Sequence, residues 1–267
     1  MRLFASLVNP SKKCYNHAMK TKWLKPLLAV LFWLLVWYLM SIWVHSPLLL
    51  ASPIAVAQRL TELIVTPAFW LTIFRSLLGI LAGFALAVVV GCLFASFSYH
   101  VPLIRDLFSP LLSIIKTIPV ACFIILVLVW IKSAYIATAI SFLMVLPIIY
   151  FNIYLGYHQV DEKLLEVAAV YHVPLMKKYR YLYLPMVLPQ FFLSLQTGVA
   201  FAFKSGVAAE VIGLSRHTIG YMIYNAKVNL ESADLLAWTV VIVLLSWLCE
   251  YLITVLVSLL KRRRALP

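Results

Sequence analysis

Four ionisable side chains lie inside strongly apolar stretches of this sequence, where they could attract an ion or bind a polar solute. They are Lys116, Lys204, Glu210 and Glu250. A charge at the middle of a bilayer costs about 2.5–3.5 kcal/mol on insertion scales, so such residues indicate either function or pairing. For Lys116 we favour a long side chain that reaches the membrane surface, and for Glu250 we favour pairing between helices.

Lys204 and Glu210 have two interpretations that both stay open. In the first, these residues and Ser205 line a solute path between two copies of the chain, and Lys204 attracts an anion. In the second, they pair with neighbouring helices. They stand six residues apart, about 240° around a helix, and therefore do not share a face. Gly206 follows Ser205, and two such small residues would let helices approach closely.

The sequence contains no catalytic or cofactor-binding pattern that we recognise. It has no G-x-x-x-x-G-K-[ST] phosphate loop, no H-E-x-x-H or G-x-S-x-G motif, and no cluster of Cys and His. The four cysteines are scattered and form no C-x-x-C pair: Cys14, Cys92, Cys122 and Cys249. We therefore expect that the chain is not an enzyme and that it holds no metal or cofactor of its own.

Composition places these residues in an integral membrane protein. Hydrophobic residues make up 64% of the chain and charged residues 12%, against about 45–50% and 25% in soluble domains. A soluble protein could not cover its surface with so few charges. The net charge of +13 would suggest nucleic acid in a soluble protein, but in a membrane protein it reflects basic cytoplasmic loops.

Hydropathy predicts an all-α fold with six transmembrane helices. The predicted spans are 26–43, 76–97, 111–131, 134–154, 186–209 and 235–260. Pro119 interrupts the third span, and 98–106 is polar enough for a short turn before it. Three prolines break the segment 45–70, which we expect to be an external loop with a short helix at about 55–63. A second external loop is expected at 210–234.

The distribution of Lys and Arg predicts that both termini are cytoplasmic. With that orientation the inner segments hold fifteen basic residues and the outer segments five. The first apolar run is longer than the core of a signal peptide, so we expect a retained span. The predicted organisation is a basic N-terminal arm (1–25), a six-span membrane domain (26–260) and a basic tail (261–267).

One predicted cytoplasmic loop, 156–184, carries a pattern of its own. From 161 it continues DEKLLEVAAVYHVPLMKKYRYLYLP, with an acidic beginning, a step of small residues and a basic middle. We predict two short helices outside the lipid, divided near His172–Pro174, with the second re-entering the membrane at Leu184–Pro185. Without further support, such a loop would be only a segment at the membrane surface.

This loop resembles the E-A-A-x-x-x-G … L-P loop in permease subunits of binding-protein-dependent ABC importers. Glu166, Ala168, Leu184 and Pro185 fall on the family's spacing, whereas His172 stands where the family has glycine. Histidine tolerates a positive φ better than most residues, so we expect the turn to form with altered geometry. The stretch 204–227 is similar to the A-E-x-x-x-x-x-x-G-[IL]-G-x-[LM] region of nitrate/sulfonate/taurine-type permeases, and 74–79 to the opening of their second span. The resemblance covers roughly 70–260.

The resemblance implies a permease subunit in the bacterial plasma (inner) membrane, coupled to a separate ATPase. The loop would be a coupling helix that rests on the ATPase, with contacts from Glu166, Val167, Ala168, Ala169, His172, Val173, Leu184 and Pro185. Two ATPase subunits would hold the ATP and Mg²⁺, and an external solute-binding protein would deliver the solute. A second copy of the chain, or a related permease, would complete the path. The expected cargo is a small anion, such as a sulfonate, nitrate or taurine, or a vitamin precursor.

One rival function uses the same intramembrane charges. An ATP-independent secondary transporter would use Lys204 and Glu210 as its ion-coupling groups. We find no internal repeat of the kind that such folds commonly carry. A membrane-embedded enzyme is disfavoured by the lack of a catalytic cluster, and a structural scaffold is not excluded by composition.

Overall fold

The computed structural model describes residues 11–46 and 48–264, with side chains between 28 and 260. Part of the predicted N-terminal arm (1–10) and the end of the tail (265–267) lie outside the described residues. Within the described part every regular element is a helix. They are α1 (Ser11–Val44), α2 (Pro53–Val65), α3 (Pro67–His100), α4 (Pro102–Thr117), α5 (Val120–Leu128), η1 (Ser133–Tyr135), α6 (Ile136–His158), α7 (Glu162–Val170), α8 (Leu175–Lys178), η2 (Tyr179–Tyr183), α9 (Leu184–Gly213), α10 (Ile219–Val228) and α11 (Ser232–Arg264).

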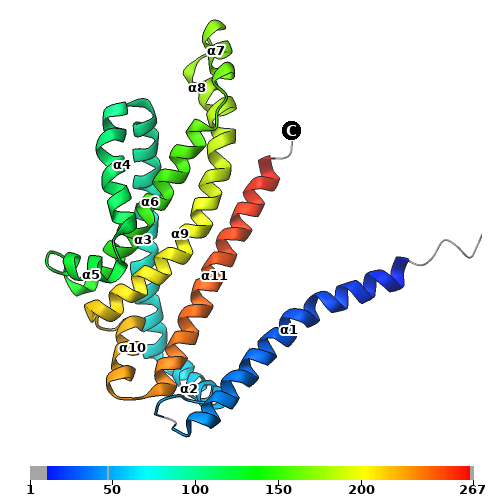
Figure 1. Cartoon of the computed structure of the whole chain (residues 1–267), viewed down its shortest axis with the longest axis vertical. Coiled ribbons are helices and arrows are strands. Elements are labelled where there is room, and N and C mark those ends of the chain that lie inside the picture. The colour runs from blue at the N-terminus through cyan, green and yellow to red at the C-terminus, as the bar shows by residue number, and fades with distance from the viewer. Residues whose placement is uncertain (1–10, 47, 265–267) are drawn as a thin grey trace, which may run out of the picture.

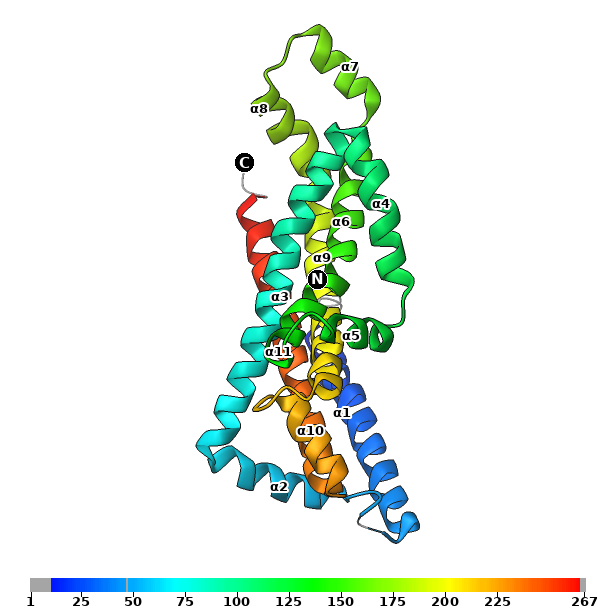
Figure 2. The same cartoon turned by 90° about the vertical axis from the view of Figure 1, so that its left-hand side faces the viewer.

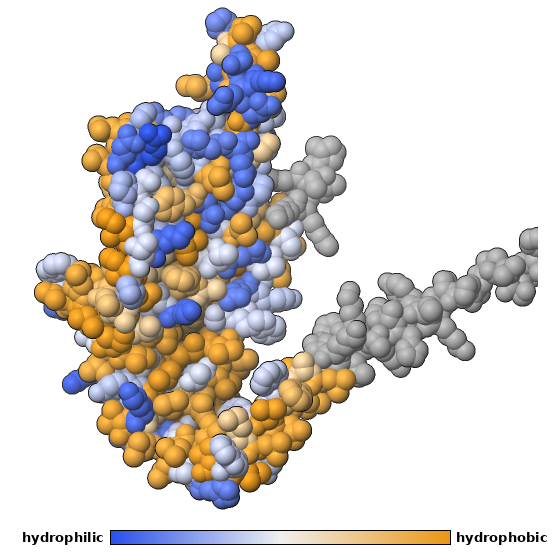
Figure 3. All heavy atoms as spheres, in the orientation of Figure 1, coloured by the Kyte–Doolittle hydropathy of each residue, from blue (hydrophilic) through white to orange (hydrophobic). Residues whose placement is uncertain are grey.

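The long helices α3, α6, α9 and α11 run along one bundle, while α7 and α8 project from one end of it (Figure 1). The helices α2 and α10 lie at the opposite end, where α1 leaves the bundle (Figures 1 and 2). We call these the α7 end and the α2–α10 end. On the face shown in Figure 3, hydrophobic residues cover most of the half nearer the α2–α10 end. The two ends of the bundle therefore present different surfaces.

Four helical stretches of the described chain are long and apolar enough to cross a membrane. They are Pro67–His100, Ser133–His158, Leu175–Gly213 and Ser232–Leu260. A fifth span is reached if α4 and α5 are counted together, and the apolar part of α1, Leu28–Val44, is shorter than these. The all-helical membrane fold is confirmed, whereas the number of six spans stays a prediction.

The third predicted span, 111–131, is interrupted at Pro119 as the sequence predicts, and the interruption is a sharp bend. Helices α4 and α5 are bent by 109° at the break between them, where Ile118 is extended and Pro119 lacks an amide hydrogen. The predicted turn at 98–106 is mostly helical. Only Val101 is extended there, because the residue before a proline disfavours the α conformation, and Pro102 then begins α4 at a position where no amide hydrogen is needed.

The predicted external loops contain helices. The short helix expected at 55–63 is α2 (Pro53–Val65), which begins with Ser52 accepting a hydrogen bond from the Ala55 amide at 3.2 Å. Its Arg59 donates two hydrogen bonds to Asp234 at the start of α11. The second loop, 210–234, contains α10 and the last residues of α9. These contacts fix the loops to the α2–α10 end of the bundle.

A stripe of small residues holds α3 against α6. It recurs every fourth position and consists of Gly79, Gly83, Ala87, Gly91 and Ala95. Residues four apart share one helix face, and small side chains there allow two backbones to approach closely. A Cβ built on Gly83 would overlap the Thr138 carbonyl oxygen and lie 2.9 Å from Ser141 Cβ.

Helix α6 is also packed against α9, which contacts α3 as well. Gly206 of α9 approaches so closely that a Cβ there would lie 2.6 Å from Ser141 Oγ. The hydroxyl groups of α6 bind backbone carbonyls on both neighbours. Thr138 donates to the Gly79 oxygen at 3.0 Å, and Ser141 donates to the Ala202 oxygen at 3.1 Å. The helices α3, α6 and α9 thus form a tightly packed three-helix core.

We predict that Gly83→Ala lowers the free energy of unfolding by about 1–3 kcal/mol, because the new methyl group would force α3 away from the Thr138 carbonyl. Gly79→Ala is the matched control, since its Cβ would meet side-chain atoms at 3.6 Å and 3.7 Å, an ordinary contact. Thermal unfolding of the purified variants in detergent measures both effects. Equal stability of the two variants would contradict the packing described for α3 and α6.

Candidate functional site

The loop at the α7 end consists of two helices divided by a tight turn, at the place where the sequence predicts the division. Asp161 begins α7 by accepting a hydrogen bond from the Lys163 amide at 2.9 Å. The helix ends where His172 donates to the Ala169 oxygen and Val173 donates to the Ala168 oxygen, both at 3.0 Å. This pair of bonds is the Schellman pattern, which satisfies the last carbonyls of a helix.

His172 occupies the left-handed position of this turn, with φ of 49°. Glycine is the most common residue at this position of the Schellman pattern. In other residues, contact between Cβ and the backbone makes the left-handed conformation less stable. The turn therefore forms with histidine at the position where the resembling family has glycine. The side chain of His172 is exposed to solvent.

One face of α7 and the following turn is apolar and exposed, although α7 lies outside the apolar spans. The exposed fractions are 48% for Leu164, 52% for Val167, 75% for Val170 and 78% for Tyr171. Figures 1 and 2 show that α7 stands clear of the bundle, so no other described helix covers this face. Exposed apolar patches outside lipid mark sites of protein interaction.

The predicted coupling residues are distributed over two places in the structure. Glu166, Val167 and Ala169 are exposed on α7, whereas Ala168 is 7% exposed. The Glu166 side chain makes no hydrogen bond or ion pair with any other described residue. The turn holds His172 and half-buried Val173, while Leu184 and Pro185 begin α9 and lie apart from α7.

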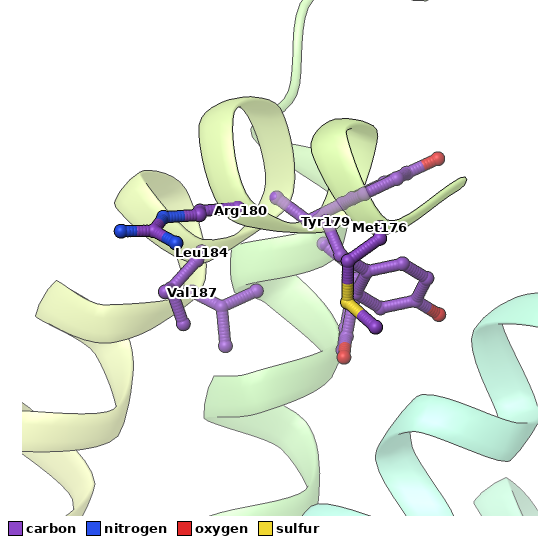
Figure 4. A pocket seen from close by; sticks show the side chains of 7 residues that line it. Met176, Tyr179, Arg180, Leu184 and Val187 are labelled. Carbon is purple, nitrogen blue, oxygen red and sulfur yellow. The ribbon is translucent and has the colours of Figure 1, made fainter. Parts of the chain in front are cut away.

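A pocket of about 240 Å³ lies where α8 and the turn η2 lead into α9. Figure 4 shows its lining, with Met176 and Tyr179 on one side, Arg180 on another, and Leu184 and Val187 between them. Of these lining residues, the sequence predicted a role for Leu184 and did not indicate the pocket itself. The aromatic run at 179–183 is the signal that could have found it.

Glu210 is buried at the other end of α9, with 1% of its surface exposed. Its Oε2 accepts hydrogen bonds from Ser76 Oγ of α3 at 2.9 Å and from the Gly220 amide of α10 at 3.0 Å. Ser76 Oγ in turn accepts a bond from the Ile219 amide at 2.8 Å. The carboxylate therefore binds the N-terminus of α10, where the unpaired amides favour negative charge.

Gly220 is required for this arrangement, because a Cβ there would lie 2.7 Å from the Val211 nitrogen. The sequence did not indicate Ser76 and Gly220 as the partners of Glu210. Gly220 lies ten residues after Glu210, within the stretch 204–227 that resembles the permease family, so a local signal for it was available. Ser76 lies 134 residues away, and no local pattern indicates it.

Lys204 lies on a different face of α9 from Glu210, as predicted from their separation. It is exposed and lines a groove of about 310 Å³ between α9 and α11. Glu250 and Ser246 of α11 line the same groove, although Lys204 and Glu250 form no ion pair. Ser205 is buried and donates to the Phe201 oxygen at 2.8 Å. The structure thus brings Lys204 together with Glu250 and separates it from Glu210.

Lys116 is placed near the end of α4. Its Nζ lies 5.9 Å from the centre of the Phe151 ring of α6, within the range of a cation–π contact.

Comparison with known proteins identifies a family over most of the chain. Residues 83–266 match the family described as the binding-protein-dependent transport system inner membrane component. A Bacillus subtilis permease protein named for aliphatic sulfonates, SsuC, is 29% identical over 82% of this chain and 77% of its own length. The nitrate import permease protein NrtB of Synechocystis is 25% identical over 77% of each chain.

Two further similarities extend over most of both chains. The taurine transport system permease protein TauC of Escherichia coli is 24% identical over 88% of this chain and 90% of its own. Among solved structures, the crystal structure of an amino acid ABC transporter with histidines superposes with a TM-score of 0.57. It is 16% identical and covers 76% of this chain and 97% of that chain. This last similarity shows a shared fold.

We predict that His172→Gly keeps or increases the stability of the turn by up to about 1 kcal/mol, because glycine adopts positive φ without strain. His172→Val places a β-branched residue in the same conformation and costs about 1–3 kcal/mol. Hydrogen exchange at the Val173 amide, which closes the turn, reports the change. Slower exchange in the valine variant than in the glycine variant would contradict the prediction.

We predict that Glu210→Ala lowers the free energy of unfolding by at least about 2 kcal/mol, since it leaves the Ser76 hydroxyl and the Gly220 amide without an acceptor in a buried place. Glu210→Gln keeps one acceptor oxygen and the shape of the side chain, so its effect is smaller. Thermal unfolding separates the two variants. Two equal and small losses would show that the carboxylate does not hold α10.

Proposed function

This chain belongs to the family of binding-protein-dependent transport system inner membrane components, and we propose that its α7 loop couples ATP hydrolysis on a separate subunit to solute uptake. Family and relatives establish a multi-pass inner-membrane permease of the ABC importer type, and not an enzyme. The coupling, the partners and the solute are the proposal.

The observation that carries the proposal is the exposed apolar face of α7. The side chains of Val170 and Tyr171 are 75% and 78% exposed. They lie at the end of α7, which is outside the apolar spans. Burying about 100 Å² of apolar surface contributes roughly 2–3 kcal/mol, so a partner that covers this face gains binding energy. Glu166 lies on the same helix, has no hydrogen-bond or ion-pair partner among the described residues, and would bind a cationic group of that subunit.

Coupling would then proceed through rigid elements. Two ATPase subunits hold the ATP and Mg²⁺, and their closure displaces the α7 loops of two permease chains. Exposed Ala169 allows close contact with the partner, and buried Ala168 accepts the hydrogen bond from Val173 that closes the turn. His172 and Val173 keep the turn compact, and Leu184 and Pro185 begin the helix that receives the displacement. The packed core of α3, α6 and α9 supports a hinge or rocking motion of the spans rather than local deformation.

We propose the orientation that the Lys and Arg distribution predicts, with the α7 end and both termini in the cytoplasm. The basic segments 1–25 and 261–267 then flank a six-span permease domain, with α1 as its first span. In this orientation the α2–α10 end faces outward, where an external solute-binding protein would dock. A second copy of the chain is the simplest partner for a path between two permeases.

Lys204 is the residue that we propose to line the solute path. Its exposed side chain lies in the groove between α9 and α11, and its charge attracts an anion. Ser205 and Glu210 would stabilise the helix that carries Lys204. Both are buried: Ser205 donates a hydrogen bond within α9, and Glu210 accepts hydrogen bonds from α3 and α10. The names of the relatives, which include sulfonates, nitrate and taurine, support a small anion as the solute.

A secondary transporter is the second candidate, because Lys204 and Glu250 line one groove without forming an ion pair and intramembrane charges are typical of ion pathways. Uptake that persists when ATP is absent and stops when the ion gradient is dissipated would favour this candidate.

We predict that Glu166→Lys abolishes copurification of the ATPase or uncouples it, because the reversed charge opposes the group that Glu166 binds. Membrane insertion should remain normal, since the residue is exposed on α7. The matched control is Glu231→Lys, which changes another exposed glutamate, between α10 and α11, and should leave copurification of the ATPase unchanged. Purification in mild detergent followed by an uptake assay measures both effects, and normal uptake by Glu166→Lys would refute the coupling role.

We predict that Lys204→Ala reduces anion uptake roughly fivefold, which corresponds to about 1 kcal/mol of lost charge attraction. Lys204→Arg keeps the charge and should retain most of the uptake. The ATPase should remain bound in both variants because Lys204 lies far along α9 from α7. Unchanged uptake by the alanine variant would leave Lys204 with a structural role only.

A further inference from the structure

Five rings meet where the α7 loop joins the bundle. Tyr99 and His100 end α3, Tyr157 lies near the end of α6, and Tyr179 and Tyr183 begin and end η2. Tyr99 stacks on Tyr157 with ring centres 4.9 Å apart, and Tyr183 contacts both, at 5.6 Å and 5.7 Å. Aromatic pairs of this kind stabilise a contact beyond the area that they bury.

Hydrogen bonds connect the same rings across elements far apart in sequence. The His100 Nε2 is hydrogen-bonded to the Tyr179 hydroxyl, 79 residues along the chain. Tyr99 donates to the Tyr183 hydroxyl at 3.5 Å. A third bond, 2.9 Å long, joins the Ser96 and Tyr157 hydroxyls and ties α3 to α6. The His100–Tyr179 bond is therefore the polar contact between the end of α3 and the beginning of η2.

The turn η2 has π-helical geometry, in which the Leu184 amide donates to the Tyr179 oxygen five residues back. Such turns are rare and occur frequently at functional sites. The pocket of about 240 Å³ lies directly beside it and is lined by both Tyr179 and Tyr183 (Figure 4). Because close-packed interiors resist movement, this void leaves η2 freer to bend than the core below it.

We propose that Tyr179 and His100 are positioning residues that transmit the displacement of the α7 loop to α3. The inference rests on the proposed function, in which the ATPase moves α7. Without the His100–Tyr179 bond, η2 bends at its π turn and the loop moves while the core of α3, α6 and α9 stays in place. With the bond, η2 and the end of α3 move together.

The positions of Tyr179 and His100 allow the transmission of movement to α3 to be tested separately from the docking of the ATPase on α7. Tyr179 follows α8 and His100 ends α3, so neither belongs to the exposed face of α7. Loss of their bond should therefore leave the ATPase bound and active, and should lower only the solute transported per ATP hydrolysed. A residue with a merely structural role would lower protein yield or ATPase binding instead.

The test uses Tyr179→Phe, which removes only the hydroxyl group. The permease, its ATPase and its binding protein are reconstituted in proteoliposomes, and uptake and ATP hydrolysis are measured together. One hydrogen bond of about 1 kcal/mol corresponds to roughly a fivefold loss in uptake per ATP. Tyr181→Phe is the matched control, because Tyr181 lies on the same turn, is 67% exposed, and its hydroxyl makes no hydrogen bond with another described residue.

Variants of His100 check that the two residues act as one unit. His100→Ala should reproduce the loss, and the double variant with Tyr179→Phe should be no worse than either single variant, since both remove the same bond. His100→Gln keeps a hydrogen-bonding side chain and should restore most of the uptake per ATP. Losses that multiply in the double variant would overturn the proposal.

The outcomes distinguish this inference from the proposed function. If the native chain takes up solute without ATP hydrolysis, the proposed function fails and the inference fails with it. If the native chain is coupled and Tyr179→Phe matches Tyr181→Phe in uptake per ATP, only the inference is overturned. It is also overturned if Tyr179→Phe releases the ATPase, because Tyr179 would then belong to the docking surface.

Discussion

The close approach of α3 and α6 is the constraint on which the rest of this structure depends. A stripe of glycine and alanine at every fourth position removes the side chains that would separate the two backbones, and α9 packs against α6 through Gly206 in the same way. In lipid, where apolar side chains gain little by leaving their solvent, such close packing and the hydroxyl bonds of Thr138 and Ser141 hold helices together. The polar groups at the α7 end and at the α2–α10 end are held in position by these three helices.

The two ends of the core are built differently, and each construction suits its proposed task. At the α7 end a compact turn and a ring cluster join an exposed helix to α3 and α9. At the α2–α10 end a buried carboxylate, Glu210, fixes α10 to α3 and α9. A displacement applied to α7 reaches the far end only if the elements between them stay rigid, which the packing of α3, α6 and α9 favours.

Much of this architecture could be predicted from the sequence because its signals are local. Apolar runs indicated the long helices, loop spacing indicated the family, and the tolerance of histidine for positive φ anticipated the turn at His172. The 109° break between α4 and α5 could not be derived from Pro119 alone, since proline marks an interruption without its angle. Ser76 lies 134 residues from Glu210, and His100 lies 79 residues from Tyr179, so only tertiary structure reveals these two pairs.

The central claim is that the exposed face of α7 binds the ATP-hydrolysing subunit. Its most direct test is site-specific photocrosslinking in the intact membrane complex, with the crosslinker placed at Val170 on α7 or at Val228 in α10, which are 75% and 59% exposed. The account predicts that Val170 captures a chain carrying a phosphate-binding loop, identified by mass spectrometry, and that Val228 does not. Capture of that chain from Val228, or its absence at Val170 in a complex that is actively transporting, would contradict the account.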